Sequence, residues 1–169
     1  EDPRRFALEP ALTLDPGPFH TPAGRTMFGA LGDSAPDRWG RLLMRRAARR
    51  RAGGPGETPR SLREIDYLLE VDDEARQGAL RFSREAGGPF LAQPGQGRIP
   101  PLVALPQLLA AADHVASDKD TNEELRLLLA PGSSLGGSRP KASVHDRDGR
   151  LAIAKFPHRD DEIDTVTWE

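Results

Sequence analysis

Ser133-Ser134-Leu135-Gly136-Gly137-Ser138-Arg139-Pro140-Lys141 and the later run Leu151-Ala152-Ile153-Ala154-Lys155-Phe156 decide how the C-terminal part of this chain folds. The first stretch is rich in glycine and serine, which favour a loop. Residues 142–145 and 151–156 have an extended rather than a helical period, and Asp146-Arg147-Asp148-Gly149 between them has the composition of a tight turn. The sequence therefore predicts a glycine loop followed by a β-hairpin.

The loop and Lys155 together form a candidate anion-binding site. Glycines let backbone N–H groups approach an anion because no Cβ intervenes. Lys155 shares its side-chain face with Leu151 and Ile153, so we expect it to be buried and to need a phosphate or a carboxylate as its partner. The alternatives are a plain helix-to-strand turn and a lysine that protects an edge strand. A Walker A loop is excluded, because Ser138-Arg139 stands where Lys-Ser/Thr is required.

The chain before the loop is predicted to be mainly helical. Asp33 or Ser34 can cap a helix with Pro36 in its first turn and an apolar stripe that begins at Trp39. Ser61 and Glu64 have the spacing of a capping box for a second helix. The other predicted elements are helices that begin at Pro106 and at residues 120–123 and end at Pro131-Gly132, a strand at residues 78–82, a linker at residues 86–101, and a last helix that begins at the acidic residues 160–164. The predicted fold class is α+β.

Seven arginines lie between Arg38 and Arg51, on the polar face of the first predicted helix. They are typical of a solvated helix face, and the alternative is a surface that binds nucleic acid or a partner protein. His158-Arg159-Asp160 resembles the catalytic triplet of kinases, but it lies too near Lys155 and lacks the following asparagine. We therefore reject that triplet as a catalytic site.

Composition narrows the possible classes of protein. The 169 residues carry a formal net charge of -2, which gives no global attraction to nucleic acid or to a membrane. Cysteine is absent, which excludes disulfides and thiolate chemistry and fits a cytoplasmic location. No apolar run is long enough for a membrane span. The sequence begins without methionine and stops at Trp168-Glu169, so we expect it to be a fragment of a longer protein.

Four motifs occur in order from Phe28 to Pro157. They are Phe28-Gly29-Ala30-Leu31-x-Asp33-Ser34-Ala35-Pro36-Asp37-x-Trp39-Gly40-Arg41, then Gly78-Ala79-Leu80-Arg81-Phe82, then Ser134-Leu135-Gly136-Gly137-Ser138-Arg139-Pro140-Lys141, and Ala154-Lys155-Phe156-Pro157. Together they resemble the HipA-like serine/threonine kinases of bacterial type II toxin–antitoxin systems. The resemblance implies that residues 1–100 are the N-terminal subdomain of that family and residues 101–169 a partial kinase-like N-lobe.

The resemblance also assigns roles to residues. Those expected to hold the ATP phosphates are Gly136, Gly137, Ser138, Arg139, Pro140, Lys141 and Lys155. Glu169 is the possible ion-pair partner of Lys155, as in the lysine–glutamate pair of kinases. Ser134 falls where the family carries an autophosphorylated serine, with Ser133 as the alternative acceptor. A phosphate there would compete with those of the nucleotide.

The family's catalytic and metal-binding residues lie in a C-lobe that this sequence lacks. The resemblance therefore implies no catalytic residue and no metal ligand here, and we expect this chain alone to be inactive. The longer protein would use ATP and Mg²⁺ to phosphorylate a protein of translation, such as an aminoacyl-tRNA synthetase, and so arrest growth. Its partner would be a DNA-binding antitoxin, with DNA bound only through that antitoxin. The alternatives are a non-catalytic module that binds an antitoxin or DNA through the Arg38–Arg51 helix, and a kinase of a small molecule.

Overall fold

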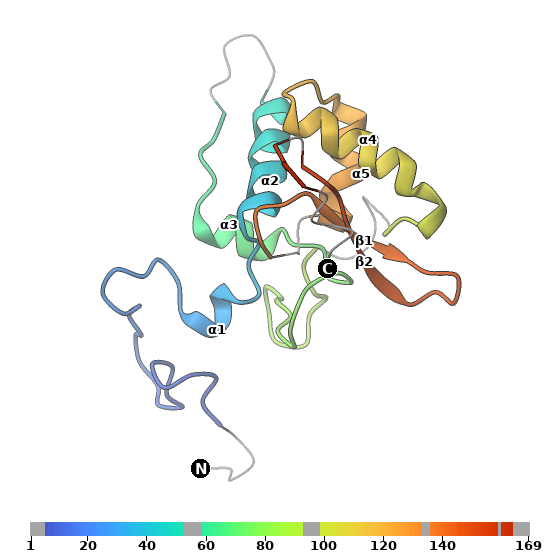
Figure 1. The fold of residues 1–169 in the computed structure, drawn as a ribbon. Helices are drawn as coiled ribbons and strands as arrows, with labels where there is room; N and C mark the ends of the chain where they lie inside the picture. Colours follow the sequence, from blue (N-terminus) through green and yellow to red (C-terminus); the bar gives the residue numbers. More distant parts are fainter. Residues whose placement is uncertain (1–5, 53–58, 93–98, 133–135, 159, 164–169) are drawn as a thin grey trace.

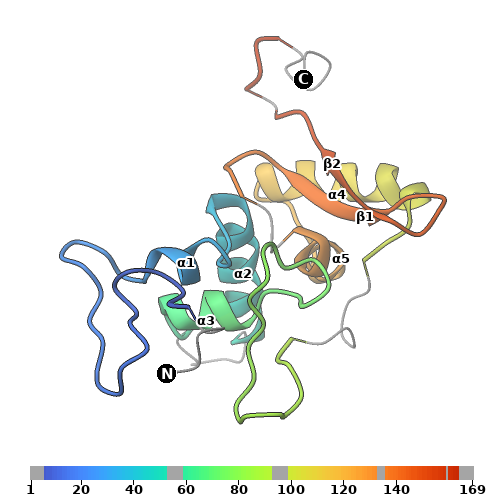
Figure 2. The same cartoon turned by 90° about the horizontal axis from the view of Figure 1, so that it is seen from below.

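Helices and one β-hairpin make up the fold, which confirms the α+β class (Figure 1). The structure is a computed structural model that describes residues 6–52, 59–92, 99–132, 136–158 and 160–163. The elements are α1 (Gly29–Gly32), α2 (Arg38–Arg51), α3 (Glu64–Leu69), the 3-10 helix η1 (Leu102–Ala104), α4 (Leu105–Ala116), α5 (Asn122–Gly132), β1 (Lys141–His145) and β2 (Leu151–Lys155). Residues 6–28, which precede α1, extend away from the packed helices in Figure 1, and in Figure 2 part of this segment loops out beside α1.

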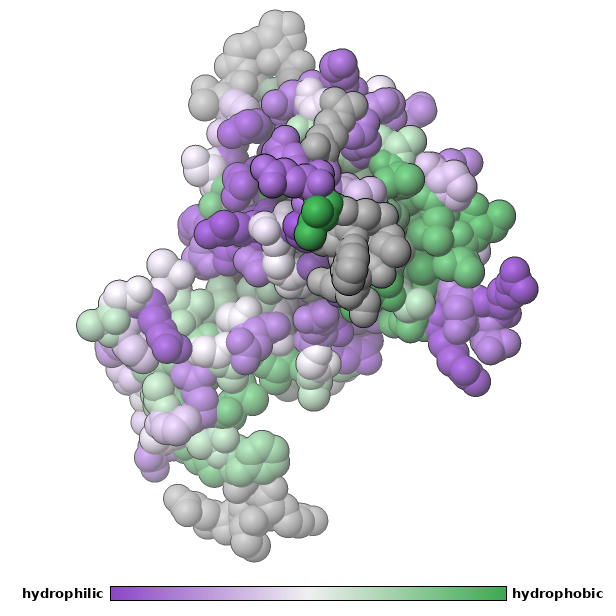
Figure 3. Space-filling model, viewed as in Figure 1, coloured by the Kyte–Doolittle hydropathy of each residue, from purple (hydrophilic) through white to green (hydrophobic). Residues whose placement is uncertain are grey.

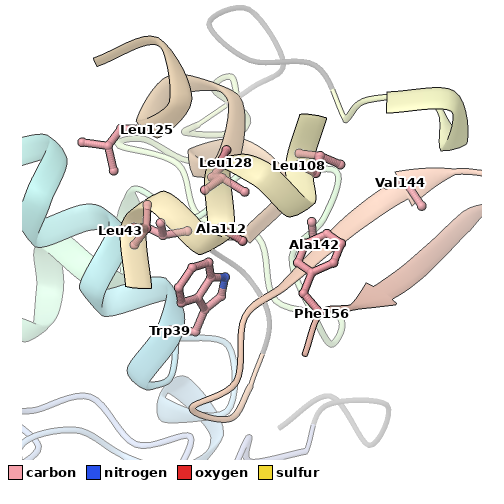
Figure 4. Packing of buried hydrophobic residues seen from close by; sticks show 11 residues of the cluster. Trp39, Leu43, Leu108, Ala112, Leu125, Leu128, Ala142, Val144 and Phe156 are labelled. Atoms are coloured by element: carbon pink, nitrogen blue, oxygen red, sulfur yellow. The ribbon is translucent and has the colours of Figure 1, made fainter. Parts of the chain in front are cut away.

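One core joins α2, α4, α5 and the hairpin (Figure 4). Its buried members are Trp39, Leu43, Leu108, Ala111, Ala112, Val115, Leu125, Leu128, Ala142, Val144 and Phe156. Burial of each large apolar side chain contributes about 1.5–3 kcal/mol, so these contacts hold the elements together. The predicted boundary at residue 100 stays a prediction, and the core takes side chains from both sides of it.

The helix predicted after Asp33 is α2, and it begins at Arg38. The residue that caps it is Asp37, whose Oδ1 accepts the Arg38 N–H at 2.8 Å. The prediction of Asp33 or Ser34 as the cap, with Pro36 in the first turn, is wrong. Asp37 is extended, with φ −88° and ψ −165°, so the helix starts only after it and leaves Pro36 outside.

The helix α3 begins at Glu64, and its predicted capping box is wrong. The backbone N–H of Arg63 donates to Asp66 Oδ2 at 2.8 Å, so Asp66 rather than Ser61 serves this helix start. Glu64 turns instead to α2, where its two oxygens accept from Arg41 at 2.8 and 2.6 Å.

The helices α4 and α5 are confirmed, and α5 has a true capping box. Thr121 N–H donates to Glu124 Oε2 at 2.8 Å, and Glu124 N–H donates to Thr121 Oγ1 at 3.2 Å. Pro131 and Gly132 form the last residues of α5 rather than a segment after it.

The β-hairpin is confirmed as an antiparallel pair with Gly149 at φ +76° in its turn. The predicted burial of the Lys155 face is wrong. Leu151 and Ile153 on that face are 48% and 55% exposed, and Lys155 is exposed as well. The opposite face of β2, with Ala152 and Ala154, packs against the core instead.

Two predicted elements are not formed within the described residues. Residues 78–82 are not a strand, and the only bridge near them pairs Ser83 with Phe90. Residues 160–163 are not helical, and residues 164–169 lie outside the described ranges. Asp161 Oδ2 instead accepts from Arg139 Nη1 at 2.7 Å and from the His158 N–H at 2.9 Å.

A cluster of charges joins α2 to the turn between α4 and α5. The Asp120 side chain is 1% exposed, and it binds Arg46 and Arg50 of α2. Asp118 binds the same Arg46 from the surface. The cluster fixes the C-terminal half of α2 against the start of α5.

The surface carries both polar and apolar areas. In Figure 3 the polar turn of the hairpin projects beside an apolar surface near the start of α4, where Leu102, Val103 and Leu109 are exposed. Among the described residues, no helix combines the length and the apolar character that a membrane crossing needs.

Candidate anion-binding site

The glycine loop lies where the first turn of α2 meets the start of β1. Gly137 has φ +92°, a conformation that side chains rarely adopt. A Cβ on Gly137 would lie 2.7 Å from Lys141 Nζ, and Lys141 Nζ donates to the Gly136 carbonyl. The positive φ favours glycine at position 137, whereas the flexible Lys141 side chain could move away from a Cβ.

Lys141 and Lys155 face each other across the hairpin. The bond from Phe156 N–H to the Pro140 carbonyl, 2.9 Å, marks residues 140 and 156 as a hydrogen-bonded pair. The next pair, Lys141 and Lys155, is then of the non-hydrogen-bonded type, in which the Cα atoms approach to about 4.5 Å and the side chains are closest. Like charges at such a pair are destabilising on their own.

The environment of Lys141 reflects this repulsion. Burial lowers the pKa of Lys141, the positive charge of Lys155 lowers it further, and the carboxylate of Asp37 opposes both. A bound anion near Lys141 and Lys155 would raise the pKa of Lys141, in the same direction as Asp37 does.

Three hydrogen bonds fasten the loop to the first turn of α2. Gly137 N–H donates to Asp37 Oδ2 at 2.6 Å, and Trp39 N–H donates to the Gly137 carbonyl at 3.2 Å. The indole Nε1–H of Trp39 donates to the Lys141 carbonyl at 2.9 Å. The bond from Gly137, with that from Arg38, lowers the pKa of Asp37 against the opposing effect of burial.

The remaining predicted residues surround this point. Pro140 is buried, and Ser138 and Arg139 are exposed. Arg139 forms the ion pair with Asp161 described above, so the segment after β2 is bound back to the loop. Thus the seven residues predicted to hold phosphate lie within one loop and the adjoining strand pair, whereas Ser133, Ser134 and Glu169 lie outside the described residues.

Sequence reasoning missed two residues of this site. In the sequence, Asp37 stood out only as part of the Phe28–Arg41 motif, and Trp39 only as the start of an apolar stripe and part of the same motif. A buried indole N–H needs an acceptor, which was a signal that Trp39 binds something polar, but its partner could not be deduced.

A groove lies between α2, α3, α5 and the segment of residues 84–92, away from the glycine loop. This groove of about 890 Å³ has apolar lining from Met44, Leu69 and Leu125, and charged lining that includes Arg126 and Glu70. The charged side chains that line the groove are therefore of both signs.

The arginines of α2 are partly used within the chain. Arg41 is bound by Glu64, and Arg46 and Arg50 are bound by Asp120. Within the described ranges, the exposed Arg45 and Arg49 have no such partner. The surface available to a nucleic acid or a partner protein is therefore narrower than the seven arginines of the sequence suggested.

Comparisons with protein-family models, with curated proteins and with solved structures gave no match to this chain, so its function is argued from the residues above.

Proposed function

We propose that this chain binds the phosphates of ATP and forms part of a serine/threonine protein kinase. The observation that carries the proposal is the pairing of Lys141 with Lys155 beside Gly137. Two ammonium groups at the closest type of cross-strand position, next to a loop glycine, are suited to a polyanion.

The donor set fits a phosphate group in its chemistry. Lys141 and Lys155 provide two point charges. Arg139 pairs with Asp161, and its guanidinium can contact two phosphate oxygens once it is released from that pair. Gly136 and Gly137 allow the main chain to approach without a side chain in the way. When bound, ATP supplies the phosphoryl group for transfer, and these residues orient and neutralise its phosphates.

The wider role rests on the resemblance to HipA-like kinases. In the cytoplasm, a longer protein that contains this chain would phosphorylate a protein of translation in an ATP- and Mg²⁺-dependent reaction. A DNA-binding antitoxin would restrain it, and phosphorylation of Ser134 would silence it, since a dianion in the loop repels the nucleotide.

Replacing Lys155 by alanine is expected to weaken ATP binding at least tenfold. Hydrogen bonds to charged groups are worth about 1.5–3 kcal/mol, which corresponds to a factor of about ten or more. Titration calorimetry of the wild type, Lys141→Ala and Lys155→Ala with ATP measures this. Lys119→Ala is the matched control, because Lys119 is an exposed lysine outside the site. Equal affinity in all four proteins, or no binding by the wild type, would contradict the proposal.

The kinase activity is tested on the longer protein. Incubation with ATP and Mg²⁺, followed by intact mass and peptide mapping, should find phosphate on Ser134 or Ser133 in the wild type and none in Lys155→Ala. Trapping of the phosphorylated substrate separates a protein kinase from a kinase of a small molecule.

The second candidate function is a non-catalytic module that binds an antitoxin or DNA. It is favoured by the exposure of Arg45 and Arg49 on one helix. If it is correct, Arg45→Glu with Arg49→Glu abolishes complex formation with the partner, measured by co-purification and by DNA mobility shift. If the kinase proposal alone is correct, the same double variant binds ATP as the wild type does.

A further inference from the structure

We propose that Asp37 is a built-in competitor of the nucleotide: its carboxylate occupies the loop N–H that a phosphate oxygen requires, and ATP binds only when this bond opens. The inference rests on the proposed ATP binding and adds a residue that sets the affinity of that site. It is carried by the geometry of the contact between α2 and the glycine loop.

The hydrogen bond to Asp37 occupies the backbone N–H of Gly137. At 2.6 Å the bond from Gly137 N–H to Asp37 Oδ2 lies at the short end for such a bond, as expected when the acceptor is charged. A backbone N–H carries one proton, so it cannot be given fully to a carboxylate and to a phosphate at once. This backbone donor of the loop is therefore filled by the protein itself.

The charge of Asp37 acts in the same direction. Its carboxylate lies close enough to Lys141 to oppose the lowering of the Lys141 pKa by burial and by Lys155. The Asp37 carboxylate next to the lysine pair offsets part of the positive charge that would otherwise attract the ligand. It also repels an approaching polyanion, because charges of the same sign repel at this range.

Asp37 is able to leave Gly137 without disrupting the fold. The residue is exposed, so its released oxygen can be hydrated. Its other oxygen, Oδ1, accepts from Arg38 at the start of α2 and can keep that bond. The competing contact is therefore separable from the capping of the helix.

Trp39 makes the opposite kind of contact from the same turn. It donates to the carbonyls of Gly137 and Lys141, at 3.2 and 2.9 Å, and so occupies acceptors rather than donors. These bonds hold the loop on α2 without using any group that a phosphate needs. When Asp37 releases Gly137, the loop stays attached through Trp39.

The decisive variant is Asp37→Asn, because asparagine caps a helix about as well as aspartate but carries no charge. We expect Asp37→Asn to bind ATP about tenfold more tightly than the wild type by calorimetry, a difference of about 1.4 kcal/mol. Asp33→Asn removes the same charge from an exposed residue before α2 and should bind ATP as the wild type does. An equal gain in both variants would assign the effect to net charge and overturn the inference.

A second measurement follows the contact itself. In the wild type, the amide signal of Gly137 in an ¹⁵N-resolved NMR spectrum should shift as Asp37 is protonated, and should also shift on addition of ATP. In Asp37→Asn the acid-induced shift should be lost, while the ATP-induced shift remains. A Gly137 amide that does not respond to Asp37 in the wild type would overturn the inference.

The two proposals fail in different ways. If the wild type binds ATP through Lys155 but Asp37→Asn binds it equally or more weakly, the competition by Asp37 is wrong and the ATP site stands. If neither protein binds ATP, the proposed function is wrong, and this inference with it.

Discussion

Asp120→Asn is expected to destabilise the fold by about 3 kcal/mol, because it removes the charge that two arginines share. Asp120 has a side chain that is 1% exposed, and it binds both Arg46 and Arg50 of α2. Breaking a buried ion pair from one side leaves an uncompensated charge and typically costs 3–5 kcal/mol. The lower end applies here, since the Arg46 and Arg50 side chains are 17% and 41% exposed and can regain water.

Thermal unfolding measures the effect. For a chain of this size, about 3 kcal/mol corresponds to a fall in Tm of about 6–12 °C. Asp118→Asn is the control, since Asp118 binds the same Arg46 but has a side chain that is 84% exposed. Asparagine is chosen because Asp118 has φ +57°, which asparagine tolerates better than alanine. An exposed pair is worth about 0–1 kcal/mol, so equal losses in the two variants would contradict the role of burial.

The helices and the hairpin could be predicted because their signals are local. The apolar stripe that begins at Trp39 and the turn that ends in Gly149 depend on spacing and on the conformational freedom of glycine. The predicted first residues and caps of the helices were less accurate. The cap at Asp37 and the role of Asp66 depend on which of several acidic side chains finds a free backbone N–H.

The face of β2 could not be predicted. Alternation shows that Leu151, Ile153 and Lys155 share a face, but it does not show which face the helices cover. The structure turns Ala152 and Ala154 toward the core, where small side chains let the strand lie close to the helices. Larger apolar residues on the other face are half exposed, and this is the opposite of what hydrophobicity alone indicates.

The candidate site was predicted in part. The loop precedes Lys141 directly in the sequence, and the hairpin brings Lys155 back beside Lys141. Local sequence patterns were therefore enough to place these groups near one another. Asp37 and Gly137 are 100 positions apart, and only the packing of α2 against the loop makes them neighbours. A contact of that kind leaves no local pattern in the sequence.

Trp39→Ala is expected to be the most destabilising single change, with a loss of about 3–5 kcal/mol for the cavity alone. The Trp39 side chain lies in the middle of the core, and the residue is 2% exposed. Gly132 has no side chain at the point where a Cβ would lie 3.1 Å from Trp39 Nε1 and 2.7 Å from Leu43 Cδ1. The end of α5 thus packs closely against the indole, and alanine would leave a cavity there.

Trp39→Phe separates packing from hydrogen bonding. Phenylalanine keeps most of the apolar ring but cannot donate to the Lys141 carbonyl, which accepts the indole N–H at 2.9 Å. An unsatisfied carbonyl costs about 1–3 kcal/mol, so we expect a loss in that range by urea denaturation. If Trp39→Phe were as unstable as Trp39→Ala, the hydrogen bond rather than the packing would dominate. Because total stabilities of about 5–15 kcal/mol are usual, Trp39→Ala removes a large share of the stability of the fold, whereas Trp39→Phe removes mainly a contact between α2 and β1.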